Sequence, residues 1–241
     1  VAQMSMSDLV DGQDIIDEED IGMTTVSLTA SEVGAKVILT DKLLREQVTN
    51  VFSMIGKQLG DGMARKKDGD VLALYTNLNA GEKLGSTTKK MTPANVHGAI
   101  AYAKANKFGS QLYILHHPNA VAELSKAVAT VAGTAAGGEL TNGWSVDLLQ
   151  NFYSGLRPMN GVSIFEDGNI SEDSNGDGIG VIADKGAMAY LSSAATSQER
   201  QRDASLRAWE VVMTSDYGVF ELDDSRGAGI TWVVSALTTS A

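Results

Sequence analysis

The first 41 residues form a strongly acidic stretch that is poor in large apolar side chains. Nine acids and one base, Lys36, give this stretch −8 of the formal net charge of −11. Within residues 8–22, the large apolar residues are Leu9, Val10, Ile15, Ile16 and Ile21. So few apolar groups cannot offset the conformational entropy that is lost when such a segment becomes ordered. We therefore expect an arm or loop that orders on a partner surface.

The rest of the composition is that of an ordinary globular protein and excludes several classes. A chain of 241 residues, 43% of them hydrophobic, allows one large domain or two modest ones. No stretch approaches the roughly 18 uncharged apolar residues needed to cross a bilayer, so we expect no membrane insertion. The absence of cysteine excludes disulfides, thiolate metal sites and thiol nucleophiles. The acidic balance disfavours tight, specific DNA binding, and no secretory signal is expected at Val1.

The acidic arm leads into strand and helix patterns. Residues 24–40 predict two strand pieces, one around Val26 and Leu28 and one at residues 37–39. Thr40 and Asp41 suit a helix start, and one long helix is expected from there to about residue 78, with a kink near residues 60–62. One face of that helix should carry an apolar stripe: Leu44, Val48, Val51, Ile55 and Leu59.

A second segment begins after a polar connection at residues 80–90. Thr92 and Pro93 predict the start of a helix, with Thr92 as its cap. A strand at residues 111–115 and a helix at 120–131 follow, and then a small-residue loop at 133–143. Short strands are expected near 161–165 and 180–183. Residues 207–213, 219–222 and 230–234 predict an antiparallel meander that closes the chain.

The three histidines are the first candidates for chemistry. His116 and His117 are adjacent, and consecutive residues at a strand end point to opposite sides, so they cannot readily share one metal ion. His97 has no glutamate at a zinc-helix spacing. The pattern therefore favours a surface turn over a catalytic or metal-binding role.

An acidic loop resembles a calcium-binding segment. Asp173, Asn175 and Asp177 occupy the first, third and fifth positions, Gly178 supplies a glycine, and Asp184 stands at the twelfth place. The flanks read as strands instead of paired helices, and the twelfth residue is the shorter aspartate. A polar hairpin turn is the favoured interpretation, and a weak calcium site is the alternative.

No other motif assembles a site. The sequence lacks a nucleophile elbow, a phosphate-binding loop and a dinucleotide fingerprint after a strand. The basic run Arg65, Lys66 and Lys67 is short and is followed by two acids, which is typical of a solvated helix face. We expect no catalytic residue, no cofactor and no bound metal.

The order of these pieces resembles the major capsid proteins of tailed bacteriophages. The resemblance depends on an acidic arm, the phrases V-S-L-T and V-I-L-T-D-K-L-L, a long helix running into A-R-K-K-D-G-D, and D-Y-G-V-F near the end. It implies an α+β fold of the Hong Kong 97 type. Residues 1–40 would form the N-terminal arm and elongated loop, and 41–90 the first part of the peripheral domain with its spine helix. Residues 91–195 would form the axial domain, and 196–241 the second part of the peripheral domain, with its antiparallel sheet.

The function implied by this resemblance is structural. Copies of the chain would assemble into hexamers and pentamers of an icosahedral shell, in the virion, around packaged double-stranded DNA held without specific binding. Scaffolding, portal and decoration proteins are implied partners, and assembly would occur in the host cytoplasm. The first alternative is an encapsulin-type compartment shell, which resembles the same fold. The second is a mixed α/β enzyme or binding module using His116, His117 and the acidic loop.

Overall fold

The computed structural model describes residues 27–46, 50–133 and 159–235. Its helices and strands are both substantial, which places the fold in the predicted α+β class. In chain order the elements are β1 (Ser31–Thr40), α1 (Asp41–Glu46), α2 (Val51–Leu74), β2 (Lys83–Gly85), α3 (Pro93–Ala105), β3 (Leu112–His116), α4 (Pro118–Gly133), β4 (Ser163–Glu166), β5 (Asp177–Asp184), β6 (Met188–Asp203), β7 (Ala208–Glu221), the 3₁₀ helix η1 (Asp224–Arg226) and β8 (Gly227–Val233).

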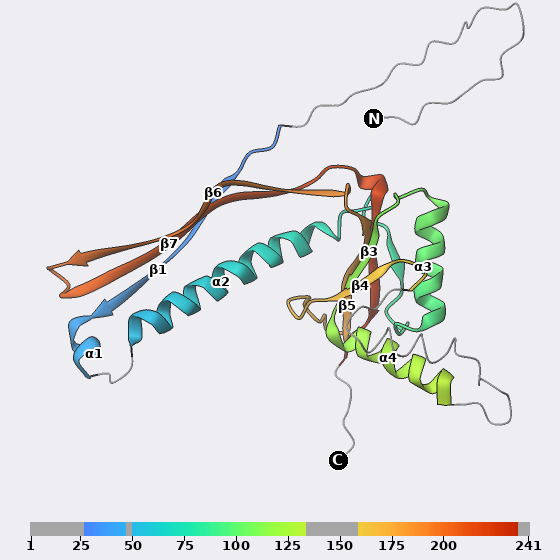
Figure 1. Cartoon of the computed structure of the whole chain (residues 1–241), viewed down its shortest axis with the longest axis horizontal. Coiled ribbons are helices and arrows are strands. Elements are labelled where there is room, and N and C mark those ends of the chain that lie inside the picture. The colour runs from blue at the N-terminus through green and yellow to red at the C-terminus, as the bar shows by residue number, and fades with distance from the viewer. Residues whose placement is uncertain (1–26, 47–49, 134–158, 236–241) are drawn as a thin grey trace, which may run out of the picture.

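The strands form two separate sheets. One is antiparallel, in the order β1-β7-β6, and the other is mixed, in the order β2-β8-β5-β3-β4. Figure 1 shows that α2 and the three-stranded sheet project together from the rest of the molecule. We call α2, β1, β6 and β7 the extension, and the five-stranded sheet with α3 and α4 the body.

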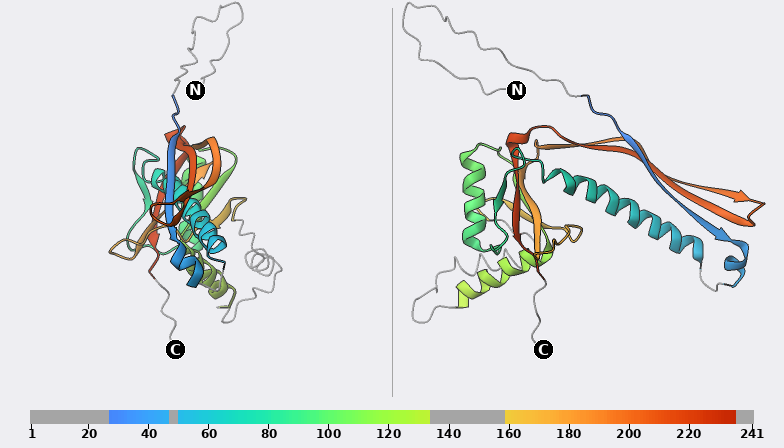
Figure 2. Two further views of the ribbon diagram at one scale, coloured as in Figure 1. Left: turned by 90° about the vertical axis from the view of Figure 1, so that its left-hand side faces the viewer. Right: turned by 180° about the vertical axis from the view of Figure 1, so that it is seen from behind.

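The extension is held together by the apolar stripe of α2. The predicted periodicity is confirmed over the described part of the helix, because side chains four residues apart return to one face. These residues pack on the sheet in one cluster: Val51, Ile55, Leu59 and Met63 of α2 with Leu39, Val211, Met213 and Tyr217 of β1 and β7. Figure 2 shows α2 covering only one face of this sheet.

The single long helix that the sequence predicted is instead two helices. Thr40 does cap a helix, since its Oγ1 accepts a bond from the Leu43 amide at 3.3 Å, but that helix is the short α1. A new helix, α2, begins after Asn50, whose side chain accepts from the Ser53 amide. It runs unbroken through the predicted kink at residues 60–62 and ends at Leu74.

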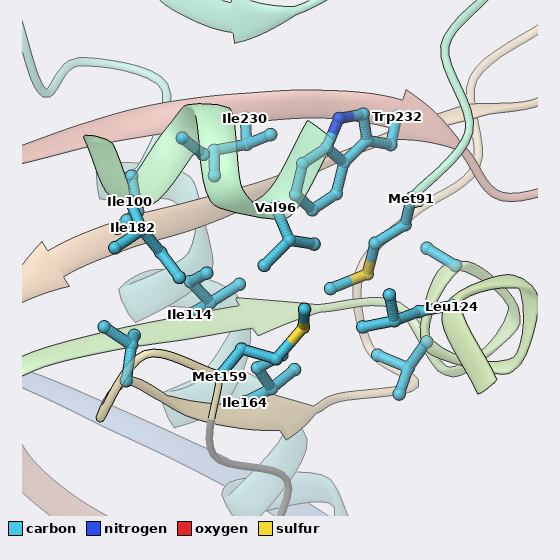
Figure 3. Close-up of a cluster of buried hydrophobic side chains, with 14 of the residues drawn as sticks. Met91, Val96, Ile100, Ile114, Leu124, Met159, Ile164, Ile182, Ile230 and Trp232 are labelled. Carbon is cyan, nitrogen blue, oxygen red and sulfur yellow. The ribbon is translucent and has the colours of Figure 1, made fainter. Parts of the chain in front are cut away.

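The body surrounds a deeper core. Thr92 caps α3 as predicted, accepting from the Asn95 amide at 3.3 Å, with Pro93 in the first turn. Side chains from α3, α4 and four strands of the sheet meet in one cluster, shown in Figure 3. Its labelled members are Met91, Val96, Ile100, Ile114, Leu124, Met159, Ile164, Ile182, Ile230 and Trp232.

A third cluster joins the extension to the body. Tyr75 and Leu78, just beyond α2, pack against Val181 and Ala183 of β5. The neighbouring Ile182 belongs to the body core on the other face of the same strand. Because alternate side chains of β5 are buried on opposite faces, this strand anchors the end of α2 to the body.

The strand arrangement near the C-terminus corrects the predicted meander. β7 is one continuous strand that joins the two predicted pieces at residues 207–213 and 219–222. It pairs with β1 on one side and, on the other, with β6, which the sequence did not predict. β8 does not pair with β7 but belongs to the five-stranded sheet, where it lies between β2 and β5. In the first segment, the piece predicted at residues 37–39 is confirmed inside the longer strand β1, whereas residues 27–30, next to the other predicted piece, form no strand. The loop predicted at residues 133–143 lies almost entirely outside the described residues.

Candidate assembly surfaces

The three histidines form no common metal site in the part of the chain that the structure describes. His116, on β3, is fully buried, with its ring 5.2 Å from that of Trp232, and within the described chain neither ring nitrogen finds a hydrogen-bond partner. Burial lowers the pKa of His116 to about 4, so the side chain is neutral. His117 accepts a bond from the Asn119 amide at the start of α4, and His97 lies exposed on α3. The surface-turn interpretation is therefore wrong for His116, which is a core residue of the body.

The acidic loop forms a tight polar turn, as the sequence favoured. Asp173 Oδ1 accepts bonds from the amides of Asn175 and Asp177 at 2.8 and 2.9 Å. Gly176 adopts a positive φ of 80° in this turn. Asp184 lies at the opposite end of β5 and accepts from the Gln111 amide at 2.8 Å. The twelve-residue calcium loop is thus not formed, because an extended strand separates its first and last ligands.

Asp177 has an unusual position at the start of β5. Its carboxylate is 2% exposed and finds no hydrogen-bond partner among the described residues. It lines a cavity of about 630 Å³ between α2, β5 and β8, together with Leu72, Thr76 and Thr231. Burial, with a contribution from the charge of Asp173, raises the pKa of Asp177. Within the described chain, no group of three acidic or imidazole side chains could hold a metal ion.

The larger free surfaces belong to the extension. β7 alternates between its two faces, so Val211 and Met213 contact α2 while Glu210 and Thr214 face away. β1 and β6 are the outer strands, and neither pairs along its outer edge within the part of the chain that the structure describes. Unpaired strand edges and an uncovered sheet face are surfaces on which other chains can add.

Polar contacts hold α2 on the sheet. The Tyr217 hydroxyl donates to Asp70 Oδ2 at 2.6 Å, and Lys66 Nζ donates to Asp70 Oδ1 at the same distance. Lys67 lies with its Nζ 5.3 Å from the centre of the Tyr217 ring and bonds Thr196 at 3.1 Å. The predicted solvated face is therefore confirmed for Arg65 and Lys66, whereas Lys67 packs on the sheet.

Comparison with known families identifies the family to which this chain belongs. A family model described as phage capsid protein matches residues 24–233, which is most of the chain. The chain belongs to the phage capsid protein family. A search of the curated proteins finds no match.

Solved structures show the same fold at low sequence identity. A capsid of the Helicobacter pylori bacteriophage KHP30 aligns with a TM-score of 0.68 and 13% identity, covering 97% of this chain and 83% of that one. A Mycobacterium phage Che8 structure gives 0.61 and 14%, covering 83% and 70%. The SrpI encapsulin of Synechococcus elongatus PCC 7942 gives 0.64 and 12%, covering 88% and 77%. The predicted Hong Kong 97-type fold is confirmed.

As a major capsid protein, the chain has a structural role in the virion shell and is not an enzyme. The encapsulin match reflects the shared fold. The family model favours a phage capsid protein over the encapsulin alternative. The described helices include none long and apolar enough to cross a membrane. The sequence did not identify the extension's outer edges, because β6 is almost entirely exposed and lacks an apolar alternation that would mark it as a strand.

Proposed function

We propose that this capsid protein assembles into hexamers and pentamers that close into an icosahedral shell around packaged double-stranded DNA. The observation that carries the proposal is the extension, which among the described residues is covered on one face only and has two unpaired strand edges. Repeating one heterologous contact around five- and sixfold axes closes rings from a single kind of subunit. The net charge of −11 suits a wall that encloses DNA without binding it tightly.

The same proposal covers location and partners. Assembly would occur in the host cytoplasm, with scaffolding, portal and decoration proteins as further partners. Residues 1–40 would be the arm and elongated loop, 41–90 and 196–241 the peripheral domain, and 91–195 the axial domain. The packing of α2 on β7 supports a peripheral domain built from two stretches. Sheet membership favours two changes to these proposed borders: β6 would join the peripheral part from Met188 onward, and β8 would join the axial part.

The size of the purified protein tests the proposal. Light scattering and negative-stain electron microscopy at micromolar concentration, with scaffold supplied, should show capsomers or closed shells. Only 25.4 kDa monomers under these conditions would contradict it.

A further inference from the structure

The far tip of the extension carries an excess of positive charge. Arg202 donates two bonds to the carboxylate of Asp41, at 2.6 and 2.7 Å, and its guanidinium lies 5.4 Å from the ring centre of Trp209. Arg45 Nε donates to the Asp41 carbonyl oxygen at 3.3 Å, and the Arg207 carbonyl accepts from the Asp41 amide at 2.9 Å. Three arginines thus surround one carboxylate. With Asp203 of the adjoining turn included, the local charge is about +1 on a chain whose total is −11.

This tip is hollowed and partly apolar. Asp41, the three arginines, Leu44 and Ala204 line an open cavity of about 710 Å³. Leu43 on α1 and Leu206 in the β6–β7 turn are 39% and 55% exposed. We call Arg45, Arg202, Arg207, Leu43 and Leu206 the tip patch.

The turn that carries half of this patch is held in one conformation. Asp203 Oδ1 accepts bonds from the amides of Ser205 and Leu206 at 2.8 and 3.1 Å, and from the Ser205 hydroxyl at 2.6 Å. The Arg202 pair with Asp41 ties the same turn to α1. A patch that is already ordered loses less conformational entropy when a ligand binds.

A carboxylate-bearing peptide with apolar side chains is the ligand that suits this patch. Guanidinium groups bind carboxylates in a planar, bidentate geometry, as Arg202 already does with Asp41. The exposed leucines call for apolar side chains beside those carboxylates. One segment of this chain has both properties: residues 8–20 hold seven acids and no base, with Ile15 and Ile16 among them.

We propose that the tip patch binds residues 8–20 of a second copy of this chain. The inference rests on the proposed function, because it names the surface on which the acidic arm of a neighbouring subunit docks. The segment joins β1 at its Ser31 end, whereas the patch lies beyond Thr40, about 30 Å away along the strand. The eleven residues from Asp20 to Ser31 span at most about 40 Å, so the segment reaches its own patch only if most of this length runs extended back along β1. A neighbouring copy has no such constraint.

Charge reversal tests the contact. The double variant Arg45→Glu with Arg207→Glu keeps the Arg202–Asp41 pair but makes the tip acidic. We expect it to melt like the parent chain and to lose at least about tenfold in shell yield. Changing residues 17–20 (Asp, Glu, Glu, Asp) to lysine in the same chain should restore the yield. The control, Lys57→Glu with Arg65→Glu on the exposed side of α2, applies the same charge change away from the tip and should leave the yield unchanged.

Disulfide trapping distinguishes a second copy from the same chain. The natural chain has no cysteine, so any disulfide reports only the introduced pair. We expect oxidised shells formed from a mixture of Leu206→Cys and Ile16→Cys chains to give a cross-linked dimer on a denaturing gel. A mixture of Leu222→Cys and Ile16→Cys chains, with a cysteine at a similarly exposed leucine far from the tip, should not.

The outcomes separate this inference from the proposed function. Normal shells from the tip double variant would overturn the inference and leave the shell function standing, as would a cross-link found only within single chains carrying both cysteines. DNA binding that is lost in the tip variant while assembly is unchanged would assign the patch to phosphate and also overturn it. No shells from the natural chain would overturn both.

The proposed contact also predicts a dependence on ionic strength. If arginines of one subunit pair with acids of another, salt screens these ion pairs, so raising the salt concentration should weaken assembly of the natural chain.

Discussion

The body and the extension enclose their apolar side chains in different ways. In the body, helices and strands surround the core, and residues such as Ile114 and Leu124 are fully buried. In the extension, one helix lies on one face of a sheet: the sheet residue Val211 is 1% exposed, whereas the helix residues Val51 and Leu59 keep 6 and 9% exposure. The body therefore completes its core within one chain. Over residues 27–46, 50–133 and 159–235, the extension leaves one sheet face and two strand edges open to neighbouring subunits of a shell.

The largest expected difference between the two regions comes from adding one methyl group. A Cβ at Gly180 on β5 would overlap the His116 ring and the Leu115 carbonyl oxygen, so Gly180→Ala should cost about 3 kcal/mol or more of unfolding free energy. A Cβ at Gly60 on α2 meets nothing within 4 Å, and Gly60→Ala should stabilise the helix by up to about 1 kcal/mol.

Urea unfolding of the unassembled chains, followed by tryptophan fluorescence and far-UV circular dichroism, measures both variants. Equal effects at the two glycines would show that the packing of body and extension does not differ as described.

His116 should make the body sensitive to mild acid. In the folded chain the pKa of His116 is about 4, below the ordinary value of 6.5. Between pH 4 and 6.5 the imidazole is therefore protonated in the unfolded chain and neutral in the folded chain. Stability attributable to His116 is complete above pH 6.5 and falls as the pH decreases, by about 2 kcal/mol between pH 7 and 5. His116→Phe should remove that part of the slope in urea unfolding series, whereas replacing the exposed His97 by phenylalanine should not. An unchanged slope in the His116 variant would show that this imidazole is not held neutral.

Tyr217 should have a smaller effect, in the extension. Its hydroxyl bond to Asp70 joins β7 to α2, and Tyr217→Phe should cost about 1.5 kcal/mol. Burial alone would raise the pKa of Asp70, but the bonds from Lys66 and Tyr217 lower it overall below 3.8. The contribution is therefore present at neutral pH and lost as the pH falls through that lowered value, so the variants should converge in strong acid. Tyr190→Phe, at a half-exposed ring stacked on Tyr217, is the matched control and should be nearly neutral.

Asp177→Ala should have the smallest effect of this series. The buried carboxylate has no partner among the described residues, so its removal breaks no bond and should leave assembly intact. Calorimetry with calcium should show weak or no binding to the natural chain. Calcium binding with a sub-micromolar dissociation constant that is lost in the variant would show that this loop is a cation site and not only a polar turn.

Local patterns made much of the fold predictable. The apolar spacing of α2 and the Thr92 cap of α3 are set by neighbours within a few residues, and both predictions are confirmed. The sequence did not predict β6, because this strand is polar and exposed and is stabilised as a strand by its pairing with β7. β8 has the alternation of a strand, but nothing in that pattern says which sheet it joins.

The tip patch illustrates the same limit for surfaces. Arg45 and Arg207 stand more than 160 residues apart in the sequence and meet only because β1 and β7 pair in register, with Thr40 opposite Ala208. A list of basic residues cannot show that grouping. The acidic stretch at residues 8–20, in contrast, can be read from the sequence because its charges lie close together along the chain. The prediction that it forms an arm lies outside the described residues.

Deletion of residues 8–22 is the most direct test, because these residues should be needed for assembly of the shell and not for folding of the subunit. The deletion should keep a cooperative melt and the circular dichroism of the natural chain, since it removes few apolar groups and none of the described core. Particles are then counted by electron microscopy under conditions where the natural chain forms shells. We predict folded subunits with few or no closed shells. Shells in normal number from the deleted chain would contradict the account.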